Sequence, residues 1–244
     1  MTKQEIDKLK RISIRGRFAY GLMCLERVTE NNGVNFPELQ LLITKMWEIT
    51  NSEKLGWWQD LLIENNPNTV IGDYQLFKNG KITFKEIGFS TINNLEEFES
   101  RVNFLKKLPS PIVKLIDKLT EIVNQNLFAG CGEHSESTLK PTIELVEILD
   151  SILDFERPII EIVKFSKFSE NHGWGNKFTR GELMEQAKLE VSRRKVIVLE
   201  REEGKREVAV NMIKAKFDDE IISKLTDLGI AEINRLRKEV EKEN

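Results

Sequence analysis

The chain has 244 residues, of which 40% are hydrophobic and 32% are charged, a composition typical of a globular protein that excludes a disordered one. Its 37 basic and 40 acidic residues give a formal net charge of −3, which excludes the basic surplus that non-specific nucleic-acid binders use. No apolar run approaches the roughly 20 residues that span a bilayer, and no secretory signal is recognised at the N-terminus, so we expect a cytoplasmic protein without membrane contact.

The first segments predict amphipathic helices. Over residues 4–30 the apolar side chains recur at three- and four-residue steps, which predicts a single helix. Its small residues Gly16, Ala19 and Gly21 would allow another helix to cross closely. A second helix is expected over about 37–50, with a proline in its first turn.

A third helix is expected to start near Ser52 and to carry Trp57 and Trp58. The stretch 66–92 then differs, because prolines and glycines divide it into short alternating runs. Asn79-Gly80 is a good type I′ turn, so the pattern predicts a small β-hairpin near 74–87. A long ordered loop is the alternative for this stretch.

The remainder again predicts helices, over about 94–107, 111–128 and 138–154. A polar, glycine-bearing loop follows and ends at residue 178, where we expect the boundary between a helical domain, 1–178, and a charged C-terminal part, 179–244. Thr179 can cap a long charged helix through about Lys216, with an interruption expected near Gly204. Residues 195–199 are rich in β-branched side chains, as strands are, but their helix-forming flanks favour helix.

The last forty residues predict a compact helix–turn–helix. Asp218 stands in an N-cap position, where its carboxylate can accept a bond from unpaired amides and complement the helix dipole. Gly229 interrupts before the last helix. The overall expectation is therefore a mainly α protein, a helical bundle with a small hairpin and a C-terminal helical pair.

Residues that could carry chemistry are scattered. Cys131 and His134 have a C-x-x-H spacing, but a zinc site needs three or four ligands, and only Cys24 and His172 remain as sulfur or imidazole donors. The same two residues could form a thiol–imidazole pair, a weak signal in a glycine-rich loop. The two cysteines are expected to be reduced. We expect no metal, no cofactor and no enzymatic activity.

Asp73 and Glu86 invite comparison with metal-dependent nucleases, in which an aspartate and a glutamate hold the metal. These enzymes place a lysine two positions after the glutamate, so that it orients the attacking water. The order here is Lys85-Glu86-Ile87, which favours an ordinary surface hairpin.

Aromatic side chains are the candidate binding residues. Trp47 and one residue of the pair Trp57 and Trp58 are expected in the core, since they follow helical spacing. Trp174 lies between two glycines after a histidine, which suits either filling a core gap or anchoring an interface. The predicted contact residues are Trp57, Trp58, His172 and Trp174.

The last helix offers an alternative interface. Four of its polar side chains could read bases or contact phosphates if the helix entered the major groove: Asn234, Arg235, Arg237 and Lys238. Glutamates at 232, 239, 241 and 243 on the same helix oppose this role. A docking or homodimerisation module through residues 205–241 is therefore favoured.

Two resemblances accompany these patterns. The segments Glu202–Lys205, Ala209–Lys214, Ile221–Thr226 and Ile230–Leu236 resemble the C-terminal end of the recombination-promoting nuclease (transposase-like) family. Its turn usually reads Thr-Gly-Leu-Ser, whereas this chain has Thr226-Asp-Leu-Gly229. The family's nuclease core is not recognised upstream, so no catalytic residue is carried over.

The upstream part, from Ile12-Ser-Ile-Arg-Gly through the Trp-rich helix to His172-Gly-Trp-Gly175, is similar in general character to bacterial immunity proteins of polymorphic-toxin systems. This likeness implies a toxin as protein partner. The expected function is neutralisation by occlusion, in which an acidic surface covers the toxin's basic active site. The alternative is a transposase-related DNA-binding or nuclease-derived regulator that uses the C-terminal helices.

Overall fold

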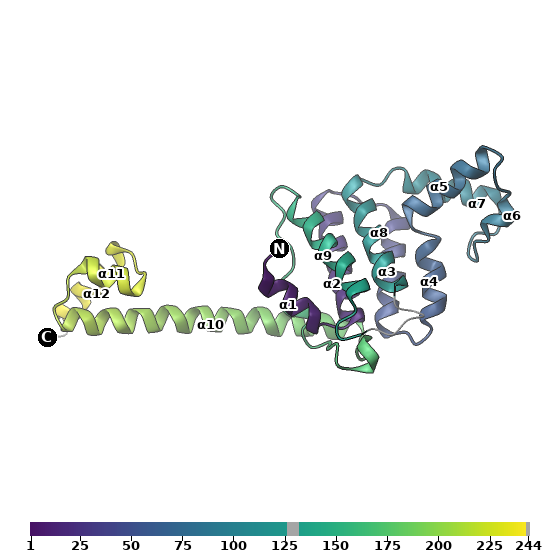
Figure 1. Ribbon diagram of the computed structural model, residues 1–244. Helices are drawn as coiled ribbons and strands as arrows, with labels where there is room; N and C mark the ends of the chain where they lie inside the picture. Colours follow the sequence, from purple (N-terminus) through teal and green to yellow (C-terminus); the bar gives the residue numbers. More distant parts are fainter. Residues whose placement is uncertain (126–131, 243–244) are drawn as a thin grey trace. The chain divides into compact units, whose positions relative to one another are not determined.

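The computed structural model describes residues 1–125 and 132–242 (Figure 1). Within these ranges the chain forms twelve α-helices and no β-strand, which confirms the mainly α prediction. Contacts divide the chain into two compact units, Met1–Ala187 (unit 1) and Lys188–Asn244 (unit 2). The predicted division after residue 178 lies just before helix α10, whereas this boundary falls inside it. No helix in the described ranges is long and apolar enough to cross a membrane.

Unit 1 contains nine α-helices and the start of a tenth. Their bounds are α1 Lys3–Arg11, α2 Ile14–Asn31, α3 Pro37–Glu48, α4 Leu55–Ile63, α5 Pro67–Lys78, α6 Phe84–Ile87, α7 Leu95–Leu105, α8 Ser110–Asn124, α9 Glu136–Asp150 and α10 Arg180–Lys214. Three short 3-10 helices join them, η1 Ile49–Asn51, η2 Ile160–Val163 and η3 Asn171–Gly173.

The single helix predicted over residues 4–30 is wrong, because the chain breaks between α1 and α2. Ile12 adopts an extended backbone, and the hydroxyl of Ser13 accepts a hydrogen bond from the amide of Gly16 at 3.0 Å. Ser13 is therefore an N-cap that starts a new helix at a different angle. The apolar period continues across the break because both helices bury one face in the same core.

The close crossing predicted at the small residues is confirmed. Helix α2 packs against α8 and α9, which lie beside each other and beside α2 in Figure 1. A Cβ atom on Gly21 would meet Leu119 at 2.7 Å and Leu145 at 2.9 Å, which is closer than side chains approach without shifting. Glycine at this position lets the three helices form the centre of the unit 1 core.

The predicted hairpin near 74–87 is wrong, since α5 and α6 occupy this stretch. Asn66 caps α5 by accepting a bond from the amide of Thr69 at 3.1 Å, and a proline fills its first position. The Asn79-Gly80 pair ends α5, with Gly80 at φ +68°. Such a pair suits a helix C-terminus as well as a hairpin turn, because glycine adopts positive φ freely.

The long charged helix is confirmed as α10, but the interruption expected near Gly204 is wrong, because the helix continues through this glycine. Thr179 and Glu182 form a reciprocal capping box, in which the Glu182 amide donates to the threonine hydroxyl at 3.2 Å and the Thr179 amide donates to the glutamate at 2.6 Å. Residues 195–199 are helical, as favoured over strand.

Unit 2 contains the rest of α10 with α11, Asp219–Thr226, and α12, Ile230–Lys242. Asp218 occupies the predicted N-cap position, although its side chain makes no capping bond. Asp227 ends α11 in the left-handed conformation, at φ 60°. The buried residues of this unit form a core of their own: Ala209, Ile213, Ile222, Leu228, Ile233, Leu236 and Val240.

Candidate functional site

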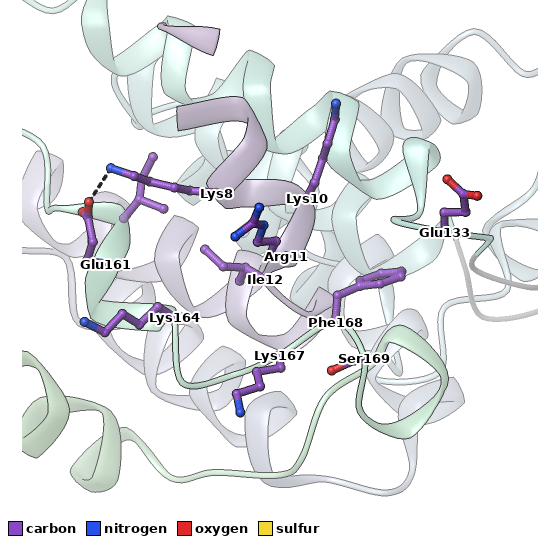
Figure 2. Close-up of a pocket in the computed structure, with 11 residues that line it drawn as sticks. Lys8, Lys10, Arg11, Ile12, Glu133, Glu161, Lys164, Lys167, Phe168 and Ser169 are labelled. Atoms are coloured by element: carbon purple, nitrogen blue, oxygen red, sulfur yellow. Dashed lines mark hydrogen bonds and ion pairs between the residues drawn. The ribbon is translucent and has the colours of Figure 1, made fainter. Parts of the chain in front are cut away.

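The candidate site of unit 1 is a cavity of about 670 Å³ beside the α1–α2 junction (Figure 2). Its walls come from α1, from η2, from the loop that follows η2 and, at Glu133, from the segment before α9. The lining residues are Lys8, Lys10, Arg11, Ile12, Glu133, Ile160, Glu161, Lys164, Lys167, Phe168 and Ser169. Five of them are basic and two are acidic, so this basic pocket has a charge opposite to that of the chain as a whole.

Backbone hydrogen bonds hold the two principal walls of the basic pocket together. The amide of Phe168 donates to the carbonyl of Arg11 at 2.9 Å, and Ile12 and Lys167 form an antiparallel bridge. The amide of Ser13 donates to the carbonyl of Ser166 at 2.9 Å. These bonds place the basic side chains at 11 and 167 on adjacent segments before any ligand binds.

Two buried serine hydroxyls strengthen the same junction. The hydroxyls of Ser13 and Ser166 lie 2.6 Å apart. Gly175 packs directly over them, because a Cβ atom on Gly175 would lie 2.4 Å from the Ser13 hydroxyl. Gly175 also has φ +75°, a conformation that other residues rarely adopt. The junction therefore has little freedom to rearrange.

Arg17, a fully buried side chain of α2, supports the pocket from beneath. Its guanidinium donates to the carbonyl of Leu9 at 3.1 Å and to that of His134 at 2.7 Å. It also donates to the hydroxyl of Thr138 in α9 at 2.7 Å and lies 5.3 Å from the centre of the Phe168 ring. Arg17 thus ties α1, α9 and the aromatic side chain of the pocket into one body.

Two of the pocket's lysines lie beside acids. Lys8 forms an ion pair with Glu161 at 2.5 Å, the contact drawn in Figure 2, and Lys10 lies 3.4 Å from Asp7. With five basic and two acidic residues in its lining, the pocket keeps a positive surplus. The half-buried Phe168 provides apolar surface between the charges, whereas Ile12 and Ile160 in the lining are only 2% and 3% exposed. This arrangement can hold a ligand that combines carboxylates with an apolar group.

The side chains that could bind a metal are not gathered in the described ranges, where no three His, Cys, Asp or Glu residues form a site. Cys131, one of the two residues of the C-x-x-H spacing, lies outside the described residues. His134 lies 3.0 Å from the Glu136 carboxylate. Burial raises the pKa of the Cys24 thiol to about 12, so Cys24 stays protonated at neutral pH and is a poor nucleophile.

The predicted tryptophan contacts lie apart from the basic pocket. Trp58 is 4% exposed and belongs to the core, whereas Trp57 is 53% exposed and packs edge-on against it, with ring centroids 4.5 Å apart. Trp174 is half-buried, 5.9 Å from the Arg15 guanidinium. His172 is exposed and has φ 53°. Of the four predicted contact residues, only Trp57 and His172 are therefore exposed enough to contact a partner.

The arginines predicted to contact DNA are held by acids of unit 2 itself. Arg237 pairs with Asp219 at the start of α11 and donates to the carbonyl of Phe217 at 3.0 Å. Arg235 pairs with Glu232 at 3.1 Å and with Glu239 at 3.7 Å. Asn234 and Lys238 are exposed. Arg237 thus serves to join α11 to α12.

The basic pocket was not found by sequence reasoning. Its cations come from two short clusters, Lys8 to Arg11 and Lys164 to Lys167, which the fold brings together from opposite ends of unit 1. Each cluster alone resembles an ordinary solvated helix end. Comparisons with protein-family models, with curated proteins and with solved structures found no match.

Proposed function

We propose that the protein is a non-enzymatic binding protein that captures an acidic segment of a partner protein in the basic pocket. The observation that carries this proposal is the excess of cations around apolar surface in a chain whose net charge is −3. A local charge opposite to the total charge selects partners by complementarity and directs their approach.

The size of the pocket supports a peptide segment as ligand. Cavities of about 300–1,000 Å³ enclose ligands of a few side chains, and this one has about 670 Å³. An apolar residue of the segment would pack on Phe168, with its acidic neighbours near Arg11 and Lys167. Glu133 and Glu161 in the lining would repel a continuous phosphate backbone, which disfavours nucleic acid as the ligand.

Neutralisation of a toxin is the biological role that we propose for this binding. The sequence predicted an acidic surface against a basic toxin site, whereas the basic pocket favours an acidic region of the toxin. Occlusion requires only that the bound segment lie near the toxin's functional site. The DNA-binding alternative receives less support, because Arg235 and Arg237 are already engaged with acids of their own unit.

The proposal is tested with a fluorescein-labelled peptide in which one phenylalanine is flanked by aspartates and glutamates. We expect its fluorescence anisotropy to rise on titration with the full chain, and the affinity to fall as salt increases. A peptide of equal length with asparagine and glutamine in place of the acids should bind at least roughly tenfold more weakly, a difference of about 1.4 kcal/mol.

Matched variants locate the binding. Arg11→Glu with Lys167→Glu reverses two charges of the pocket, and Lys85→Glu with Lys107→Glu reverses two exposed charges elsewhere in unit 1. Only the first pair should abolish peptide binding. Equal affinity of both variants, or tighter binding of a single-stranded oligonucleotide than of the acidic peptide, would refute the proposal.

A further inference from the structure

One ion pair of the basic pocket joins two of its walls. The ammonium group of Lys8, on α1, lies 2.5 Å from the carboxylate of Glu161, on η2, and both residues line the cavity (Figure 2). The pair of Lys10 and Asp7 is different, because both residues belong to α1 and Asp7 is not part of the lining. Glu161 is therefore a carboxylate of the chain itself that binds a cation of the pocket.

The walls of the pocket do not depend on this pair. Backbone hydrogen bonds around the bridge of Ile12 and Lys167 hold the segments together, and three of the four residues of η2 are buried in the core. The side chain of Lys8 is 48% exposed and that of Glu161 is 21% exposed. An ion pair that is open to water contributes little to stability, so these two side chains can separate while the walls stay in place.

An acidic ligand and Glu161 compete for the same ammonium group. A ligand that enters the pocket meets the negative charge of Glu161 and finds Lys8 already paired. The lining has five basic and two acidic residues, and loss of the charge on Glu161 would both release Lys8 and leave a single acid. The pair of Lys8 and Glu161 thus opposes the binding of every acid that fails to displace it.

We propose that the pair of Lys8 and Glu161 is an autoinhibitory contact of the basic pocket, and that a carboxylate of the ligand opens it by replacing Glu161 at Lys8. This inference rests on the proposed function and adds a subsite to it, in which Lys8 binds one acidic side chain of the partner segment. The chemistry of the ligand follows from Glu161, since a carboxylate is the group that Lys8 already binds. Glu161 raises specificity by excluding weakly acidic segments.

Titrations of the full chain with the fluorescein-labelled acidic peptide test this contact. Glu161→Gln keeps the size of the side chain and removes its charge, so it should lower the dissociation constant at least roughly threefold. Glu133→Gln removes the other acid of the lining, which has no ion-pair partner among the described residues, and should lower the constant by a smaller factor. The peptide with asparagine and glutamine should bind both variants as weakly as it binds wild type.

A second background shows whether the effect passes through Lys8. In Lys8→Met no ammonium group at this position is released, so Glu161→Gln removes only the repulsion between its own charge and the peptide. The gain in affinity from Glu161→Gln should therefore be smaller in Lys8→Met than in wild type. Circular dichroism checks that every variant stays helical.

The outcomes separate the contact from the function on which it rests. Wild type that binds the acidic peptide, with Glu161→Gln no tighter than Glu133→Gln, would overturn the autoinhibitory contact and leave the binding function standing. A gain from Glu161→Gln that is equally large in Lys8→Met would do the same. If neither wild type nor Glu161→Gln binds the acidic peptide, the contact and the proposed function are both overturned.

Discussion

The core of unit 1 and the middle of α10 use the same aliphatic residue types in opposite ways. Leu119 of α8 is fully buried, whereas Leu199 of α10 is 63% exposed. In unit 1 the helices α2, α8 and α9 pack against one another, and buried polar side chains such as Arg17 join the helices. An apolar residue type therefore does not by itself determine burial, because burial also requires neighbouring elements that can cover the side chain.

Polar side chains in the core of unit 1 and in the middle of α10 also differ, in how far along the sequence their partners lie. Arg17 and Arg157 in unit 1 bond to several segments far apart in sequence. The ion pairs of α10 in unit 2 include contacts one turn away, such as Arg193 with Glu190 at 3.5 Å. Long-range polar contacts fix a tertiary arrangement, whereas short-range ones stabilise only the helix itself. Substitutions in the two regions should therefore change the free energy of unfolding by very different amounts.

The largest effect is expected for Arg17→Met. The change leaves several buried carbonyl oxygens without a donor, at about 1–3 kcal/mol each, so unit 1 should lose roughly 5 kcal/mol or more. Urea unfolding followed by tryptophan fluorescence measures this loss of stability, because all four tryptophans lie in unit 1. Arg27→Met, which removes one exposed bond to the Glu156 carbonyl, is the matched control. Similar midpoints for the two variants would contradict the role assigned to Arg17.

The next effect is expected in unit 2. Ile233→Ala removes a fully buried side chain from its small core and should cost roughly 2–4 kcal/mol. Far-UV circular dichroism should show part of the helical signal lost at lower urea, while the tryptophan transition stays in place. A shift of the tryptophan transition equal to that of the dichroism would show that the two units unfold together.

Sequence patterns predicted those features that depend on neighbours along the chain. The Thr179 cap, the long helix and the proline at the start of α3 all follow from contacts within one turn. The break at Ser13 was missed because the apolar period continues across it. The end of α5 at Asn79 was missed because an Asn-Gly pair suits a hairpin turn as well as a helix end. The basic pocket was missed for a stronger reason, since its walls meet only through the tertiary bonds around Arg11, Ser166 and Arg17.

A smaller, pH-dependent effect is expected for Glu5→Gln. Burial acts to raise the pKa of Glu5, but bonds from the Thr2 backbone and from Arg157 outweigh it and lower the pKa from 4.5 to about 2. A lowered pKa stabilises the fold above pH 4.5, and this stabilisation disappears as the pH falls toward about 2. Glutamine keeps the capping bonds without the charge.

Wild type should therefore exceed Glu5→Gln in stability by roughly 1.5–3 kcal/mol at pH 7, as for hydrogen bonds to charged groups. The difference should shrink between pH 4.5 and 2 and vanish below. Urea titrations of both proteins across this range measure it. A difference that is independent of pH would show that the carboxylate charge is not what stabilises this junction.

The smallest effect is expected for Leu199→Ala, which tests the contrast between the exposed Leu199 and the buried Leu119. Leu199→Ala and Leu119→Ala remove the same atoms, but Leu119→Ala empties part of a packed core and should cost roughly 2–5 kcal/mol. Leu199→Ala should change stability by no more than about 0.5 kcal/mol, since the Leu199 side chain already contacts water. Urea unfolding of both variants measures the difference, and a large loss of stability for Leu199→Ala would mean that this part of α10 is covered in solution.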